Sequence, residues 1–112
     1  MTTARKVLIQ SQDAPIVQAA LYTAVNLTAT IDKLTATNTT PGAVMISVNL
    51  VPGGDVVGSG NLIAKTVSIA AGGSYNFPEV VGHDLADGDS ISVLASAAGV
   101  TVRASGRETT TN

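Results

Sequence analysis

The stretch VMISVNL, residues 44–50, decides the fold. In this stretch the branched aliphatic residues Val44, Ile46, Val48 and Leu50 alternate with Met45, Ser47 and Asn49. Successive side chains of a β-strand point to opposite sides, so a period of two predicts a strand with one buried face. The same alternation recurs over residues 100–105 and, more weakly, over residues 91–96.

Further runs of strand length lie between turn-forming residues that recur at short intervals. They are ARKVLIQ (4–10), IVQAALYTA (16–24), LTATIDKLTAT (27–37), NLIAKTVSI (61–69) and SYNFPEV (74–80). The apolar set of the third run shifts phase, which predicts a bulge or bend near Asp32–Lys33. Pro78 lacks an N–H group, so its strand should be short or at a sheet edge. We predict an all-β fold, an antiparallel β-sandwich of about eight strands, jelly-roll-like or immunoglobulin-like.

The chain of 112 residues is the size of one domain, which we place at residues 1–112. Short extended termini are expected at about 1–5 and 108–112. Hydrophobic residues make up 45% of the chain, but the aromatic ones are only Tyr22, Tyr75 and Phe77. Small aliphatic and β-branched side chains must therefore fill the core, which again favours strands.

Charged residues are scarce, at 12% of the chain with a net charge of −2, and none occurs from Leu34 to Gly54. Either Thr, Ser and Asn cover the surface, or other subunits do. The second interpretation predicts a homo-oligomer, first a trimer and second a dimer. The few scattered Lys and Arg residues argue against a nucleic-acid partner. The apolar runs are too short to span a membrane, and with no Cys there is no thiol chemistry.

The segment GHDLADGD, residues 82–89, gathers the only His with three acids and suggests a metal site, an acid–base cluster or a turn. The spacing of His83, Asp84, Asp87 and Asp89 matches neither a calcium loop nor a zinc site. A turn explains more. Leu85 would enter the core, Gly88 would take a positive φ, and Asp89 would accept backbone N–H bonds. We therefore expect no catalytic, cofactor-binding or metal-binding residues, and no enzyme.

Two other features have ordinary explanations. The segment GGDVVGSGN, residues 53–61, lacks the remaining elements of a nucleotide-binding loop, and we interpret it as a long hairpin connection. Arg103 and Arg107 lie four apart, hence on one face of the last strand. They could pair with Glu108 or with Asp residues of a neighbouring subunit, or stay solvated.

Over residues 16–108 the order of strands and turns resembles small β-sandwich virion proteins of tailed bacteriophages. These are capsid decoration (cement) proteins and related tail or fibre modules. The resemblance rests on the order of the elements and on short sequence motifs at the turns: AAG at 70–72 and 97–99, L-x-x-G-D-x-I at 85–91, and S-G-x-E at 105–108. It implies a structural, non-enzymatic role and assigns no site residues.

The leading hypothesis is therefore a decoration protein on the virion capsid surface, made in the host cytoplasm, with the major capsid protein and itself as partners. The alternative is a tail, neck or fibre module. A third hypothesis is a carbohydrate-binding adhesion module, with Tyr22, Tyr75 and Phe77 as its only aromatic platforms. The Thr-rich ends, MTTARK and RETTTN, could add to an exposed sheet edge of a neighbour or fold back on their own domain.

Overall fold

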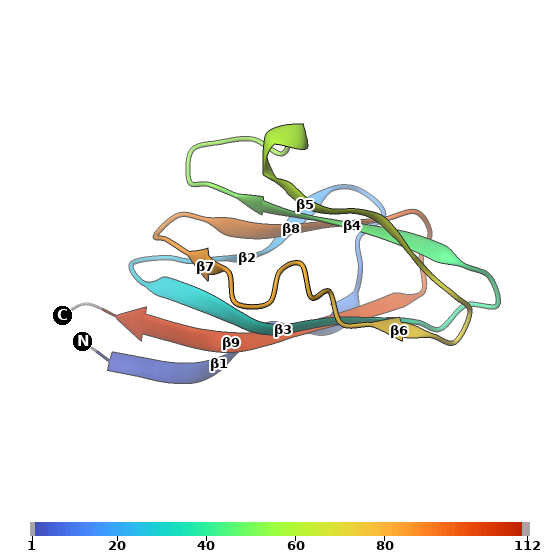
Figure 1. The fold of residues 1–112 in the computed structure, drawn as a ribbon, viewed down its shortest axis with the longest axis horizontal. Coiled ribbons are helices and arrows are strands. Elements are labelled where there is room, and N and C mark those ends of the chain that lie inside the picture. Colours follow the sequence, from blue (N-terminus) through green and yellow to red (C-terminus); the bar gives the residue numbers. More distant parts are fainter. Residues whose placement is uncertain (1, 111–112) are drawn as a thin grey trace.

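The alternating runs form the strands of two antiparallel sheets, in a computed structural model that describes residues 2–110 (Figure 1). The elements are β1 (Thr2–Asp13), β2 (Ala19–Thr23), β3 (Thr28–Asn38), β4 (Val44–Val51), a 3₁₀ turn (Ser59–Asn61), β5 (Leu62–Ile69), β6 (Ser74–Tyr75), β7 (Asp84–Leu85), β8 (Ser90–Ala95) and β9 (Val100–Thr110). The prediction of an all-β sandwich is confirmed.

The strand order identifies the type of sandwich. Sheet A runs β1-β9-β3-β6, with β7 also paired to β3, and sheet B runs β2-β8-β4-β5. The pairs β1–β9, β2–β8, β3–β6 and β4–β5 nest inside one another, like the two arms of one long hairpin. Rolling that hairpin up adds the pairs β3–β9 and β4–β8. This is jelly-roll connectivity rather than the immunoglobulin arrangement.

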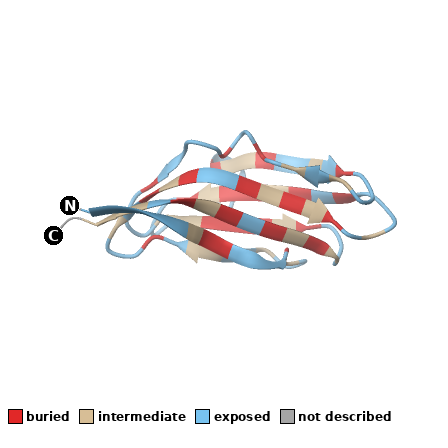
Figure 2. Cartoon of the chain, turned by 90° about the horizontal axis from the view of Figure 1, so that it is seen from below, coloured by how far each residue is buried: buried red, intermediate tan, exposed pale blue. Residues whose placement is uncertain are grey.

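The core lies between the sheets and is built from small aliphatic side chains. Buried residues alternate with more exposed ones along the strands (Figure 2). In β4, Val44, Ile46 and Val48 are buried and Met45 is exposed, as the alternation predicts. Phe77 is fully buried and meets Tyr75 edge to face, with ring centroids 4.8 Å apart. That pair supplies much of the aromatic packing available to so aromatic-poor a chain.

The predicted irregularity at Asp32–Lys33 is a register shift in the β3–β9 ladder. Ile31 lies opposite Gly106 and the next pair is Lys33 with Ser105, so β3 has one extra residue there. The prediction for Pro78 also holds, since β6 has two residues and lies at the edge of sheet A. The short strand β7 was not predicted.

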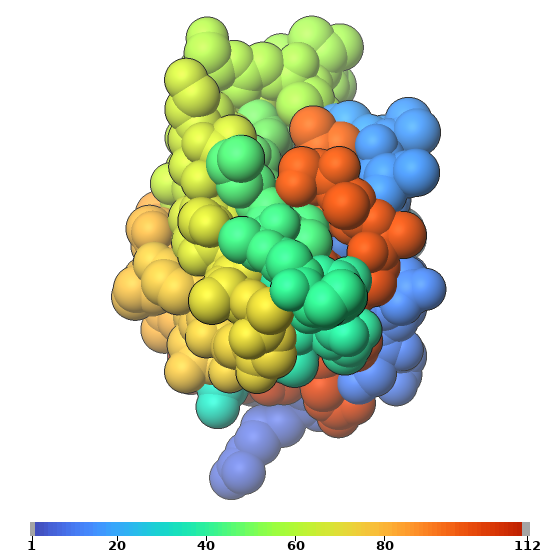
Figure 3. Space-filling model, turned by 90° about the vertical axis from the view of Figure 1, so that its right-hand side faces the viewer, coloured from blue at the N-terminus to red at the C-terminus, as the bar shows by residue number. Residues whose placement is uncertain are grey.

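Loops gather at the two ends of the sandwich. The end shown in Figure 3 carries the β1–β2, β3–β4, β5–β6 and β8–β9 connections. Asn38 is fully buried beneath this end, where its side-chain amide donates to the carbonyl oxygens of Gly42 (2.7 Å) and Ile69 (2.9 Å). Its side-chain oxygen accepts the backbone N–H of Thr40 at 2.9 Å. One buried amide thus ties the β3–β4 loop to the end of β5.

The ends of the described chain pair with each other. Thr2–Ala4 lie opposite Glu108–Thr110 in the β1–β9 ladder, so of the two arrangements considered for the ends, these residues fold back on their own domain. Met1, Thr111 and Asn112, which complete the predicted extended termini, lie outside the described residues. Contact of the ends with a neighbour stays a prediction.

Candidate interaction surfaces

The segment GHDLADGD forms the turn that leads into β8. Leu85 is buried in the core, and Gly88 has φ = +92°, a conformation that suits glycine. One Asp89 oxygen accepts the backbone N–H of Ala86 and the other that of Gly53, both at 2.9 Å. The predictions for Leu85, Gly88 and Asp89 are confirmed. Asp89 also joins this turn to the β4–β5 loop.

The remaining acids of the segment are engaged separately. Asp84 accepts the Thr30 hydroxyl at 2.8 Å, and Asp87 accepts the backbone N–H of Asn26 at 2.7 Å. His83 is exposed, and its backbone N–H and C=O both bond within the chain. Over residues 2–110, no three His, Asp or Glu residues are grouped closely enough to hold a metal ion.

The β4–β5 connection, residues 52–61, is the hairpin loop that we predicted. Its side-chain hydrogen-bond network was not predicted. Asn49 is buried at an outward-facing position of β4, and its amide donates to Asn61 Oδ1 at 2.8 Å and to the Gly58 carbonyl at 3.0 Å. Asn61 in turn donates to the Val56 carbonyl at 2.9 Å. This network holds the loop over one end of the outer face of sheet B (Figure 1).

Arg103 and Arg107 share one face of β9, as predicted, and this is the outer face of sheet A. Arg107 pairs within its own chain. Its guanidinium makes a bidentate salt bridge with the Asp32 carboxylate through Nε and Nη2, with a shortest N–O distance of 2.9 Å. The pKa of Arg107 is raised above its usual range, first by the hydrogen bond to Asp32 and second by the negative charge of the Asp32 carboxylate. None of the alternatives that we considered for Arg107 (a solvated side chain, Glu108 or an Asp of a neighbouring subunit) included Asp32, which lies at the register shift of β3 beside Arg107.

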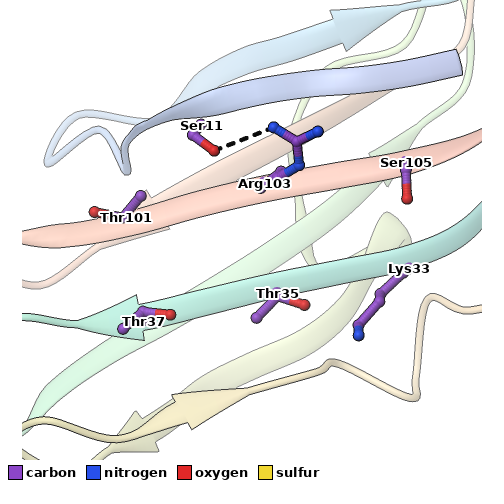
Figure 4. Close-up of a pocket in the computed structure, with 7 residues that line it drawn as sticks. All are labelled: Ser11, Lys33, Thr35, Thr37, Thr101, Arg103 and Ser105. Carbon is purple, nitrogen blue, oxygen red and sulfur yellow. Dashed lines mark hydrogen bonds between the residues drawn. The ribbon is translucent and has the colours of Figure 1, made fainter.

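A groove crosses the outer face of sheet A (Figure 4). Two cationic side chains and five hydroxyl groups line it, from Lys33, Arg103, Ser11, Thr35, Thr37, Thr101 and Ser105. These residues come from β1, β3 and β9. Within residues 2–110, the Arg103 guanidinium makes one side-chain hydrogen bond, a long one of 3.4 Å to the Ser11 hydroxyl. The groove is therefore polar and positively charged, in a chain whose net charge is negative.

The outer face of sheet B has the opposite character. Its strands carry one of the chain's charged residues, Lys65, whereas those of sheet A carry Arg5, Lys6, Asp13, Asp32, Lys33, Asp84, Arg103, Arg107 and Glu108. A shallow groove on sheet B is lined by Ile16, Met45, Ser47, Thr66, Leu94, Ala95 and Ser96. Ile16 is 59% exposed and Met45 47% exposed. The charged residues of the strands are thus concentrated in sheet A. The uncharged stretch 34–54 indicated this only in part.

Thr66, in the groove on sheet B, has a left-handed backbone with φ = +44°. A β-branched residue adopts this conformation rarely and at a cost of about 1 kcal/mol or more. It is held there partly because its backbone N–H donates to the Ser47 hydroxyl at 2.8 Å. Strained residues of this kind concentrate at sites of interaction.

Each of the three aromatic side chains is buried or makes a hydrogen bond within the domain. Phe77 is buried, and Tyr75 donates to Glu79, with a shortest distance of 2.9 Å. Tyr22 is half-buried and donates to Glu108 at 2.6 Å. An aromatic platform for a sugar ring would need an exposed ring face, which Phe77 lacks.

Comparisons with protein-family models, with curated proteins and with solved structures found no match to this chain. In the described part of the chain there is no helix of the length and apolar character needed to cross a membrane.

Proposed function

We propose that this protein is a non-enzymatic structural component of a tailed-phage virion, a decoration protein that binds the assembled capsid through the outer face of sheet B. The observation that carries the proposal is the segregation of charge. The outer face of sheet B exposes Ile16 and Met45, and the strands of that sheet carry a single charged residue, whereas the strands of sheet A carry nine.

Free protein surfaces are normally rich in charge, and contiguous exposed apolar groups mark places where another protein binds. The groove beside Met45 offers apolar side chains and hydroxyls, which suit contact with an uncharged protein surface. Docking there would bury both strained Thr66 and the exposed methyl groups of Ile16.

A decoration protein stabilises the shell because it binds the assembled state and not the free subunits. Self-association multiplies weak contacts through avidity, and we retain a trimer as the favoured state and a dimer as the second. The major capsid protein and further copies of this chain are the proposed partners, and the capsid surface is the proposed location.

The test uses Met45→Lys, which places a charge in the apolar groove. Val81→Lys is the matched control, because Val81 is 45% exposed, similar to Met45, but lies outside sheet B. We expect Met45→Lys to keep the melting temperature of the wild type and to lose binding to undecorated capsids in a co-sedimentation assay. Val81→Lys should bind normally. Equal binding by both variants would overturn the assignment of this face.

Copy number in purified virions separates the two structural roles. A decoration protein should be present in hundreds of copies per particle, counted by quantitative mass spectrometry. A handful of copies would instead assign it to the tail, neck or fibre. Sedimentation as a stable monomer at micromolar concentration would count against the trimer.

A further inference from the structure

We propose that the groove on the outer face of sheet A binds an acidic carbohydrate, with a ligand carboxylate held between Lys33 and Arg103. This site lies on the opposite sheet from the proposed docking face and does not depend on the proposed function. Its argument starts from the register of β3 and β9.

Lys33 lies opposite Ser105 and Thr35 lies opposite Arg103, so Lys33 and Arg103 are diagonal neighbours on adjacent strands. Diagonal positions on one face of an antiparallel pair are about 7–8 Å apart, within the reach of long side chains. Both residues line the same groove, with the Arg103 guanidinium turned toward Ser11 on β1 and the Lys33 amine turned away from β9 (Figure 4). Both side chains are long and exposed, so rotation about their side-chain bonds can bring the two cationic groups onto a single anion.

The positive charge of the groove is not neutralised locally. In the described part of the chain, no carboxylate lies within 4.0 Å of the Lys33 amine or the Arg103 guanidinium. The nearby acids are engaged elsewhere, because Asp32 is paired with Arg107 and Asp84 accepts the Thr30 hydroxyl. An anion entering the groove thus gains two charge-assisted hydrogen-bonding partners and displaces no ion pair.

The hydroxyl groups around the cations indicate a polyhydroxylated ligand. Thr37, Thr101 and Ser105 extend the groove along the two strands on either side of the charges. Thr35 already donates its hydroxyl hydrogen to Asn76 Oδ1 at 3.0 Å, so its oxygen remains an acceptor. Such groups match the alternating donors and acceptors of a sugar ring. The Thr methyl groups and the Lys33 stem supply apolar contact for its C–H faces.

The same lining disfavours other anionic polymers. Unpaired nucleic-acid bases are usually bound by stacking on aromatic rings, and none lines this groove. An acidic peptide would seek pockets for its side chains or an open sheet edge for its backbone. The groove lies instead on the paired interior of sheet A, across β9 and β3.

The probe is trigalacturonate, and its fully methyl-esterified form is the matched neutral ligand with the same rings. We expect trigalacturonate to shift the amide NMR signals of β3 and β9 and not those of β5, and the ester to bind more weakly by about tenfold or more. Binding should weaken as salt is raised, since both cations are exposed. Absence of shifts on sheet A would overturn the proposal.

Lys33→Ala and Arg103→Ala should each weaken binding by about tenfold, while Lys65→Ala, which removes the lone charge of sheet B, should leave it unchanged. All three side chains are exposed, so the melting temperatures should match that of the wild type. Acetate and phosphate form the last arm of the test. If either binds as tightly as trigalacturonate, the groove is a simple anion site and the carbohydrate assignment fails.

Discussion

The Tyr22 hydroxyl donates a 2.6 Å hydrogen bond to the Glu108 carboxylate and so joins the two sheets of the sandwich. Tyr22 is on β2 of sheet B and Glu108 on β9 of sheet A, 86 positions apart in the chain. Hydrogen bonds to ionised acceptors are shorter and stronger than neutral ones. This bond closes the sandwich at the end where both termini lie (Figure 1).

Tyr22→Phe should destabilise the protein by about 1–2 kcal/mol, because it removes this bond and leaves a partly buried carboxylate without its donor. Thermal unfolding should show a fall in melting temperature of roughly 4–10 °C. Tyr75→Phe is the control, since its bond to Glu79 is exposed and spans four residues. An equal loss in both variants would contradict a special role for the link between the sheets.

The same contact predicts how stability depends on pH. Burial first, then the hydrogen bond and the charge of Glu108, raise the pKa of Tyr22 well above its usual value near 10. The folded state therefore holds this proton after the unfolded state has released it. The stabilisation is fully present below about pH 10 and is lost as the pH rises through the folded pKa. Melting curves from pH 8 to 12 should fall less steeply for Tyr22→Phe than for the wild type.

Local features of this fold could be predicted because they depend on neighbours in the chain. The alternation at Val44–Leu50, the phase shift at Asp32–Lys33 and the turn at Gly88 each involve a few consecutive residues. The choice between a jelly roll and an immunoglobulin sandwich depends on which distant strands pair. The pattern of alternating residues within each strand does not predict which strands pair, because partners such as β1 and β9 come from opposite ends of the chain.

The interaction surfaces were harder to predict for the same reason. Lys33 and Arg103 are 70 positions apart, and only the register of β3 against β9 makes them neighbours. The hydrogen bond between Asn49 and Asn61 joins an outward-facing position of the predicted strand 44–50 to the end of the loop 53–61, and nothing in the local sequence marks either amide as a partner of the other. Of the residues that line the groove on sheet B, Met45 lies in the uncharged stretch 34–54 that we singled out in the sequence. Ile16 and Leu94 are distant in sequence and come next to Met45 only in the folded chain.

Gly106→Ala should prevent stable folding or cost more than about 3 kcal/mol. A Cβ at this position would overlap the Thr30 carbonyl oxygen and come within 2.9 Å of Leu8 Cδ1. The carbonyl cannot retreat without opening the β3–β9 ladder at its bulge. Gly42→Ala is the control, because a Cβ there meets nothing within 4 Å, and its stability should stay near that of the wild type. Soluble Gly106→Ala with an unchanged melting temperature would contradict the close approach.

Removal of divalent metal should leave stability unchanged. Asp84, Asp87 and Asp89 each accept hydrogen bonds from a different segment, from Thr30, Asn26 and the Ala86 and Gly53 amides respectively. A metal bound only by the folded state would add stability that disappears with it. Melting curves with EDTA and with added calcium should therefore coincide. A drop of several degrees in EDTA would return these acids and His83 to consideration as ligands.

Deletion of residues 1–4 together with residues 109–112 should lower the melting temperature of the isolated protein. Thr2–Ala4 pair with Glu108–Thr110, and Thr28 pairs with Thr109, so the deletion removes the terminal pairs of the β1–β9 and β3–β9 ladders. It also exposes Glu108 and weakens the Tyr22 contact beside it. Circular dichroism melts of the full and shortened chains measure the effect, and capsid co-sedimentation of the shortened chain is the second readout. A normal melting temperature combined with lost capsid binding would show that the ends serve as anchors to a neighbour instead.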